Sequence, residues 1–351
     1  MGDWYLDAIA LERMIPERSS IDVQLREKGN PAMHYRRLGR SGLKVSEISL
    51  GAWINFGGQV DEKTAAELVR AAYEQGVNYF DNADIYANGQ AEIMMGKAIR
   101  GLPREGLVLS SKVFWPTMPG PNGRGLSRKH VTESINATLR RTNVEYLDLY
   151  YCHRFDPDTP LEELVWTMTN LIHQGKILYW GTTEWEAAQV AQAIGVARQY
   201  NLIAPSMDQP QYNLFHRRRV ELELSPLCRD LGLGLTTSSP LYSGILSGKY
   251  NNGIPEGSRA TLSDMGWMRD RITPERIAIV RKLTALATEL EVTTAQLALA
   301  WILRRKEVSS VITGAARLEQ LDENLAAAEA LDRLTDDLLE QIEKIVGNLP
   351  E

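Results

Sequence analysis

Apolar and polar positions alternate along this chain in two patterns. Short, mostly apolar runs are separated by longer segments in which apolar residues recur every three or four positions. The short runs predict buried strands, and the longer period predicts amphipathic helices. The expected strands are 48–53, 77–83, 107–113, 146–152, 177–182, 205–208, 233–237 and 308–312, and the expected helices are 63–74, 91–100, 127–141, 161–173, 187–200, 218–231, 274–290, 293–304, 318–328 and 336–346.

Strand and helix signals follow one another in eight units. Strands this apolar imply a parallel sheet whose outer face is covered by helices. Eight units favour a closed (β/α)8 TIM barrel over an open doubly wound sheet. An open sheet that held a dinucleotide would need a glycine fingerprint in its first turn, and neither Gly57-Gly58 nor Gly232-Leu233-Gly234 has that spacing. The expected fold class is therefore α/β, a (β/α)8 barrel.

The start of the chain differs from the rest. Residues 1–32 are polar, contain Pro16 and Pro31 and show no sustained period, so we expect an N-terminal extension. Residues 34–45 predict a β-hairpin, with Gly and Ser in its turn. We expect one barrel domain over 33–351, with the hairpin before its first strand and additional helices at its C-terminal end.

Composition narrows the class of protein. The chain has 351 residues, of which 44% are hydrophobic and 24% charged, values typical of a soluble globular protein. The formal net charge of −6 argues against a nucleic-acid partner. No apolar run approaches the ~20 residues that span a bilayer, the first residues lack signal-peptide features, and the two cysteines, Cys152 and Cys228, suit a reducing compartment. We expect a cytoplasmic protein with no inserted membrane segment and no metal site.

Three consecutive expected strands end in side chains that can transfer protons. Strand 77–83 leads into Asp81 and Tyr86, strand 107–113 contains Lys112 near its end, and strand 146–152 is followed by His153. Each residue alone has an ordinary structural explanation: a helix cap, loop packing, a surface lysine or a structural histidine. The carboxyl ends of barrel strands share one rim, however, so neighbouring strands would bring all four together.

The four side chains suit the reduction of a carbonyl group. A tyrosine has a pKa near 10 and is a weak acid at neutral pH. We expect the ammonium of Lys112 to lower the pKa of Tyr86, Asp81 to hold the ammonium, and His153 to orient a carbonyl oxygen. Such a site can protonate an alkoxide as a hydride reduces the carbonyl.

The chain resembles the aldo-keto reductase superfamily over about residues 33–349. The motif Gly76-Val77-Asn78-Tyr79-Phe80-Asp81 and the segment Ser239-Pro240-Leu241 carry the resemblance, and Asp81, Tyr86, Lys112 and His153 match the catalytic tetrad of that family. The segments 51–59, 112–115, 124–130, 179–182, 247–250 and 253–259 look like the branch that includes the β subunits of voltage-gated potassium channels and related bacterial and plant reductases.

The resemblance implies an NADPH site and an apolar substrate pocket. Thr183 and Gln209 match positions that contact the nicotinamide carboxamide, and Arg317, Lys249 and Arg259 would together favour a 2′-phosphate, hence NADPH over NADH. Trp53 and Trp115 would line the substrate pocket, with Tyr242 as a further aromatic. The full set of expected cofactor residues is Trp53, Gln59, Thr183, Gln209, Ser238, Ser239, Pro240, Leu241, Ser243, Gly244, Lys249, Arg259, Gly314, Arg317, Gln320, Glu323 and Asn324.

Three positions depart from the family pattern. Ser238 stands where the family usually has an aromatic that stacks on the nicotinamide, Glu184 replaces an Asn, and Ala316 replaces a hydroxyl near the 2′-phosphate. The absent aromatic predicts weaker NADPH binding than in relatives that have it. His153 stands where the channel β subunits carry Asn, which favours a working reductase.

The leading interpretation is an NADPH-dependent reductase of aldehydes or ketones in which Tyr86 donates the proton. One alternative is a regulatory subunit that holds the cofactor beside a membrane partner with little turnover. Another is a barrel isomerase or lyase without nicotinamide. The physiological substrate is open, and the resemblance to channel β subunits suggests a homotetramer.

Overall fold

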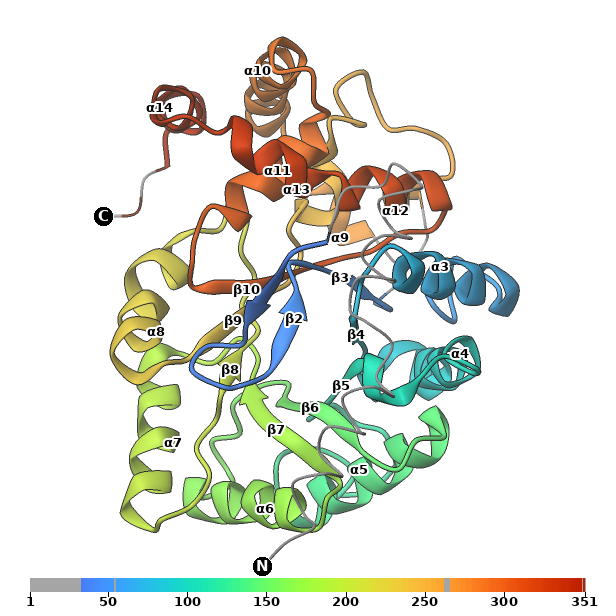
Figure 1. Cartoon of the computed structure of the whole chain (residues 1–351), viewed down its shortest axis with the longest axis vertical. Coiled ribbons are helices and arrows are strands. Elements are labelled where there is room, and N and C mark those ends of the chain that lie inside the picture. The colour runs from blue at the N-terminus through green and yellow to red at the C-terminus, as the bar shows by residue number, and fades with distance from the viewer. Residues whose placement is uncertain (1–32, 54, 262–265, 349, 351) are drawn as a thin grey trace, which may run out of the picture.

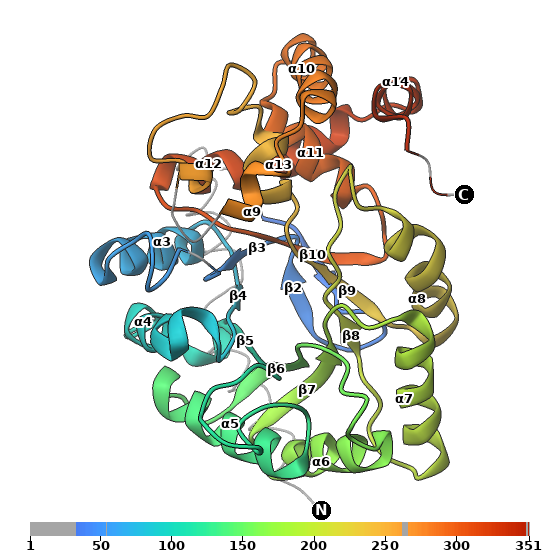
Figure 2. The same ribbon diagram turned by 180° about the vertical axis from the view of Figure 1, so that it is seen from behind.

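The structure, a computed structural model, describes residues 33–53, 55–261, 266–348 and 350. Eight parallel strands form a closed barrel in the order β10-β3-β4-β5-β6-β7-β8-β9, surrounded by helices (Figures 1 and 2). The predicted (β/α)8 fold is confirmed. The strands are β3 (Ile48–Gly51), β4 (Tyr79–Asp81), β5 (Val108–Val113), β6 (Leu147–Cys152), β7 (Ile177–Thr182), β8 (Met207–Asp208), β9 (Gly234–Thr237) and β10 (Val308–Thr313).

Helices cover the outside of the barrel, and α10 to α14 gather on the side of β10 in Figure 1. The helices are α3 (Glu62–Glu74), α4 (Gln90–Ala98), α5 (Arg128–Thr142), α6 (Leu161–His173), α7 (Ala187–Gln199), α8 (Ser225–Leu231), α9 (Gly266–Arg269), α10 (Pro274–Glu289), α11 (Thr294–Leu303), α12 (Leu318–Leu325), α13 (Ala327–Ala330) and α14 (Asp336–Val346). None of the helices in these described ranges is long and apolar enough to cross a membrane.

Two helical predictions differ from the structure. The expected helix 318–328 is interrupted at Ala326, which separates α12 from α13. The expected helix 218–231 opens with a π-helical segment, η3 (Arg219–Leu224), before α8. The predicted start of α5 is confirmed, because the Ser127 side chain caps it and accepts from the backbone N–H of His130 at 3.3 Å.

The hairpin closes the amino end of the barrel. Strands β1 (Tyr35–Arg37) and β2 (Lys44–Ser46) pair in antiparallel fashion, and β2 crosses the middle of the barrel in Figure 1. Leu38 and Val45 are fully buried and pack with residues from inside the barrel, including Tyr79, Leu149 and Met207. This contact removes apolar surface from water at the end where the strands begin.

Gly39 permits the close approach of the hairpin to the barrel. Its φ is +55°, and a Cβ there would lie 2.3 Å from the carbonyl oxygen of Gly232. The neighbouring Arg40 N–H donates to that same oxygen at 2.9 Å. A side chain at position 39 would therefore separate the hairpin from the start of β9.

Residues 1–32, expected to form an extension, lie outside the described residues, as does the side chain of Arg259. The division of the chain at residue 33 stays a prediction.

Candidate active site

Three adjacent strands bring the predicted acid–base residues to one end of the barrel. Asp81 is the last residue of β4 and is paired in register with Ser110 of β5. Lys112 lies near the end of β5, and His153 directly follows β6, which pairs with β5. Because the strands are parallel, these three side chains emerge at the same carboxyl rim.

Lys112 is the centre of the site. Its side chain is fully buried, and its Nζ donates to Asp81 Oδ2 at 2.6 Å, to the Asn82 carbonyl oxygen at 2.6 Å and to the Tyr86 hydroxyl at 3.3 Å. An ammonium has three hydrogens, so these three acceptors use its full donor capacity. The lysine is thereby fixed between the carboxylate and the phenol.

Asp81 is held by further hydrogen bonds to residues distant in the chain. Its Oδ1 accepts from Ser110 Oγ at 2.7 Å and from Gln209 Nε2 at 3.0 Å, with the Tyr79 hydroxyl at 3.4 Å. Gln209, expected to contact a nicotinamide carboxamide, thus has one amide hydrogen bonded to Asp81. The Tyr79 hydroxyl also lies 3.1 Å from that of Tyr151, so a buried polar network continues into the barrel.

A strained turn follows Tyr86. Ala87, Asn88 and Gly89 all have positive φ, at 47°, 53° and 85°. This region suits Gly and is tolerated by Asn, but it costs a residue such as Ala on the order of 1–3 kcal/mol. The turn reverses the chain before α4, while the Tyr86 hydroxyl stays within reach of Lys112.

Burial outweighs the lysine in setting the acidity of Tyr86. Burial raises the pKa of Tyr86 above its usual value, and the charge of Lys112 opposes that rise without reversing it. The expectation of a lowered pKa is wrong for the protein alone, because sequence does not reveal how dry the site is. The phenol therefore stays protonated at neutral pH.

The pKa values of Lys112 and His153 are shifted in opposite directions. Burial by itself would lower the pKa of Lys112, but Asp81 and then Tyr86 raise it above its usual value, so the amine stays charged. Burial, followed by the charges of Lys112 and Arg154, lowers the pKa of His153 to about 2. A neutral imidazole can donate a hydrogen bond to a carbonyl oxygen. Nδ1 of His153 is buried and has no hydrogen-bond partner among the described residues.

Aromatic rings surround the reacting groups. The His153 ring lies 6.1 Å from that of Tyr86 and 6.2 Å from that of Trp115, both in edge-on arrangements. Trp53, the other predicted pocket residue, is 39% exposed. Tyr242 is buried and packs on the rings of Phe215 and His216, at 5.4 and 5.2 Å between centroids. Trp115 is thus the expected pocket residue with a ring contact to the tetrad.

The exits of β7 and β9 offer unused polar groups to a ligand. Thr183 Oγ1 and Ser243 Oγ are buried and lack hydrogen-bond partners within the part of the chain that the structure describes. Ser243 lies in η4 (Tyr242–Ser247), a turn with positive φ at Tyr242, Ser243 and Gly244, and Ser239 just before it also has positive φ. Buried hydroxyls without partners are costly unless a ligand completes them, so this loop fits a bound cofactor.

Four of the expected cofactor residues, Gly314, Arg317, Gln320 and Asn324, lie in the loop before α12 or in that helix. Gln320 Oε1 accepts from the Ala316 N–H at 2.9 Å, and Asn324 Nδ2 lies 3.5 Å from the Gly314 carbonyl oxygen. These two side chains therefore brace the loop between β10 and α12. Arg317 is exposed at the N-cap of that helix, where helix geometry favours anions.

The remaining expected cofactor residues, and Glu184, lie in the segments that follow β3, β7, β9 and β10. A Cβ on Gly244 would approach Lys249 Nζ to 2.7 Å, which places the amine against this glycine. Glu184 forms an ion pair with Arg219 at 3.3 Å. Gln59 is exposed, Pro240 is buried, and Ser238, Ser239, Leu241 and Glu323 are half-buried.

A buried pair of carboxyl groups supports the loop before Tyr86. Asp84 Oδ2 accepts from Ser134 Oγ at 2.7 Å, and the fully buried Glu92 accepts from Ser111 Oγ and Arg141 Nε, each at 2.5 Å. Burial raises the pKa of Asp84 to about 7, with Glu92 adding to the rise and Ser134 and Arg141 opposing it.

This carboxyl predicts a pH dependence of stability. A pKa raised on folding stabilises the protein below the unfolded value near 4, and the benefit is lost as the pH rises through about 7. Asp84→Asn should therefore flatten the decline in the free energy of unfolding between about pH 4 and 7, by on the order of 4 kcal/mol. Urea unfolding across this range measures it, with the exposed Asp158→Asn as control. Equal slopes in wild type and Asp84→Asn would contradict the assignment.

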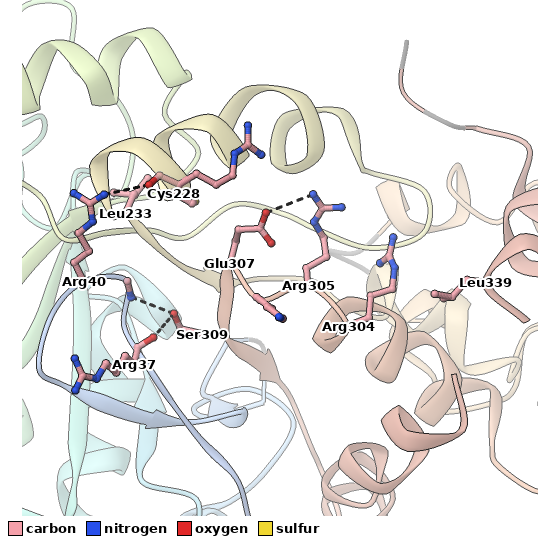
Figure 3. Close-up of a pocket in the computed structure, with 13 residues that line it drawn as sticks. Arg37, Arg40, Cys228, Leu233, Arg304, Arg305, Glu307, Ser309 and Leu339 are labelled. Carbon is pink, nitrogen blue, oxygen red and sulfur yellow. Dashed lines mark hydrogen bonds and ion pairs between the residues drawn. The ribbon is translucent and has the colours of Figure 1, made fainter. Parts of the chain in front are cut away.

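The cavity in Figure 3 lies away from this site. It has a volume of about 720 Å³ and is lined by the hairpin residues Arg37 and Arg40 and by residues before β9 and β10. Arg40 donates to the carbonyl oxygens of Arg229 and Asp230 at the end of α8, and Arg305 pairs with Glu307 at 3.8 Å. This cavity is at the amino end of the barrel, opposite the tetrad.

A second cavity, of about 910 Å³, lies at the carboxyl ends of β7 and β8. It is lined in part by Glu184, Gln211, His216 and Arg219. The described residues hold no group of three or more His, Cys, Asp or Glu side chains arranged to bind a metal ion.

Comparison with known proteins agrees with this geometry. The sequence model of the family described as "Aldo/keto reductase family" matches residues 47–346. A protein of Arabidopsis thaliana, "Probable voltage-gated potassium channel subunit beta", is 47% identical over 323 residues, which cover 91% of this chain and 98% of that protein. A protein of Oryza sativa subsp. japonica with the same name is 46% identical over the same coverage.

Proposed function

Because this chain belongs to the aldo/keto reductase family, a family of oxidoreductases that generally bind NAD(P)H, we propose that it is an NADPH-dependent reductase of aldehydes and ketones. The observation that carries the proposal is the buried Lys112 amine, bonded to both the Asp81 carboxylate and the Tyr86 phenol. A phenol beside a fixed cation can give up its proton and be stabilised as phenolate.

The chain's own residues provide the acid–base part of the reaction. Tyr86 donates its proton to the carbonyl oxygen of the substrate, and the Lys112 ammonium stabilises the phenolate that remains. Asp81 holds Lys112 in place through the 2.6 Å ion pair. The neutral His153 directs an N–H at the same carbonyl oxygen. NADPH, when bound, supplies the hydride that the carbonyl carbon accepts, so the net change is addition of H⁻ and H⁺ across C=O.

The cofactor preference rests on two cations. Arg317 at the start of α12 and Lys249 beside Gly244 lie on the rim at β9 and β10. Positive side chains there suit the additional phosphate of NADPH. The buried hydroxyls of Thr183 and Ser243 give the cofactor polar partners. We propose that NADPH is preferred over NADH on these grounds.

Ser238 predicts a modest cofactor affinity. It is half-buried, and its N–H donates to the Pro210 carbonyl oxygen at 2.9 Å. A hydroxymethyl group provides no stacking surface, whereas an aromatic pair contributes about 0.5–1.5 kcal/mol. Ser238→Trp should therefore tighten NADPH binding about 2- to 10-fold in a fluorescence titration. Unchanged affinity in a folded Ser238→Trp protein would contradict this explanation.

A panel of aldehydes and ketones, assayed with NADPH and with NADH while cofactor oxidation is followed, tests the proposed function. We expect turnover of reactive probes such as 4-nitrobenzaldehyde, faster with NADPH at low cofactor concentration. A folded protein that bound neither nicotinamide would instead support a barrel isomerase or lyase.

The names of the relatives favour one other function. The two plant relatives, which are 47% and 46% identical to this chain in sequence, are named probable voltage-gated potassium channel β subunits. The second candidate function is therefore a regulatory subunit that holds NADPH with little turnover. Tight NADPH binding without reduction of any carbonyl in the panel would favour it. A homotetramer and a cytoplasmic location stay predictions under either function.

A further inference from the structure

Two arginines lie near the Trp115 ring at the mouth of the site, and one of them, Arg124, also lies 5.4 Å from the Phe114 ring centroid. The Arg154 guanidinium carbon lies 5.7 Å from the Trp115 ring centroid, and that of Arg124 lies 6.0 Å from it. Trp115 in turn contacts the His153 ring, which contacts that of Tyr86. A continuous row of side chains thus joins both cations to the reacting groups.

Neither arginine has an ion-pair partner among the described carboxylates. The half-buried Arg154 donates from Nη1 to the carbonyl oxygen of its neighbour His153 at 2.5 Å. The nearby Asp156 accepts instead from the Leu126 N–H at 2.7 Å and from Thr159 Oγ1 at 2.8 Å. Asp81 is paired with Lys112. The mouth therefore carries excess positive charge in a chain whose formal net charge is −6, and such a cleft attracts anions.

Arg154 also acts electrically on the reacting groups. Its charge is among the causes that hold down the pKa of His153, after burial and Lys112, and it opposes the rise in the pKa of Tyr86. Geometry places the same guanidinium near the site: it lies 5.7 Å from the Trp115 ring centroid, and that ring lies 6.2 Å from the His153 ring.

The two arginines lie too far around the barrel to bind the cofactor phosphates at their proposed position. Trp115 and Arg124 follow β5, and Arg154 follows β6, whereas the loops that fit the cofactor follow β9 and β10. In the closed ring of eight strands, β5 is four strands from β9, and β6 is four strands from β10. The arginines therefore face the rim diametrically opposite the proposed phosphate site.

We propose that the substrate is an anionic carbonyl compound, an aldehyde or ketone with a carboxylate or phosphate group that Arg154 binds, with Arg124 at the outer edge. This inference rests on the proposed reductase function and names its substrate class. A guanidinium presents a planar fork of donors that matches either oxyanion. Trp115 supports the fork by stacking and packs on the apolar part of the substrate.

The test compares substrates that differ only in charge. Methyl 4-formylbenzoate is the neutral partner of 4-formylbenzoate, the 2- and 3-formyl isomers vary the distance between charge and carbonyl, and 4-formylphenyl phosphate replaces carboxylate by phosphate. We expect kcat/KM at low ionic strength to favour an anion over the ester. In Arg154→Met the anion-to-ester ratio should fall about 10- to 100-fold, the loss expected for a charged hydrogen-bonded contact. Arg140→Met, which removes an exposed charge from the last turn of α5, should keep the wild-type ratio.

Equal kcat/KM for anion and ester in the wild type, or an unchanged ratio in Arg154→Met, would overturn the inference. A binding measurement separates its failure from that of the proposed function. With NADP⁺ present, isothermal titration compares 4-(hydroxymethyl)benzoate with its methyl ester. If the protein prefers the carboxylate and Arg154→Met abolishes that preference, the anion site is supported, whether or not any aldehyde is reduced. Failure to reduce any aldehyde would count against the proposed reductase function alone. The absence of that preference overturns the anion site. Comparison of the phosphate and carboxylate substrates then identifies the preferred oxyanion.

Discussion

Tyr86→Phe should lower kcat for aldehyde reduction by about 10²- to 10⁴-fold, the usual contribution of a positioned general acid. The variant removes only the hydroxyl oxygen, which lies 3.3 Å from Lys112 Nζ. The ring remains to pack edge-on against His153. Since burial keeps the pKa of Tyr86 above its usual value, the phenol holds its proton throughout the neutral range and is available as the acid.

The measurement is steady-state reduction of 4-nitrobenzaldehyde with saturating NADPH, together with a fluorescence titration of NADPH. Cofactor affinity should change little, because in the proposed mechanism the lost hydroxyl contacts the substrate oxygen and not the cofactor. Tyr200→Phe, at an exposed tyrosine after α7, is the matched control and should retain wild-type kcat. Turnover of Tyr86→Phe at more than a tenth of the wild-type rate would rule out Tyr86 as the proton donor.

Lys112→Met should both abolish turnover and destabilise the fold by about 3–5 kcal/mol, the cost of removing one partner from a buried ion pair. Asp81 would be left buried without its cation, although Ser110 and Gln209 would still donate to its Oδ1. In the double variant with Asp81→Asn, the uncompensated charge disappears, so we expect at least half of the lost stability to return. Turnover should not return, because the cation that stabilises the phenolate is still missing.

Urea unfolding of the wild type and of the single and double variants measures this effect. Lys129→Met provides the contrast, because Lys129 and Glu133 form an exposed pair on α5, and such pairs contribute at most about 1 kcal/mol. If Lys112→Met lowered the free energy of unfolding no more than Lys129→Met does, the buried pair of Lys112 and Asp81 would not stabilise the fold as expected.

The sequence predicted the architecture well because the signals for it are local. The bounds of α6, β7 and α14 agree with the expected segments 161–173, 177–182 and 336–346. Buried parallel strands and amphipathic helices have distinct apolar periods. The split between α12 and α13 at Ala326 was missed, because alanine carries no breaking signal and the division is set by tertiary packing.

The site was predicted only where residues stand at strand ends. Asp81, Lys112 and His153 could be placed at one rim from the order of the strands, and the structure brings Lys112 to both Asp81 and Tyr86. Ser110 and Gln209 were not assigned to Asp81, because their contacts join positions 29 and 128 residues away in the chain. Such pairings depend on barrel register, which the sequence does not display.

Nothing in the sequence distinguishes Arg154, although it directly follows His153. Its proposed role in binding an anion depends on two features of the fold. Arg154 forms no ion pair with a carboxylate among the described residues, and it lies near the ring of Trp115, 39 positions earlier in the chain. The sequence does not reveal the raised pKa of Tyr86 for a related reason. The number of charges near a group can be guessed from sequence, whereas the amount of water around it cannot.

The hairpin that packs Leu38 and Val45 into the amino end of the barrel has a kinetic consequence for the proposed reductase. Together with the side chains that fill the barrel interior it closes that end, so we expect both reactants to enter from the carboxyl rim. When two reactants share one entrance, the more deeply seated one is expected to bind first and leave last. The closed amino end therefore predicts an ordered binding sequence at the opposite end.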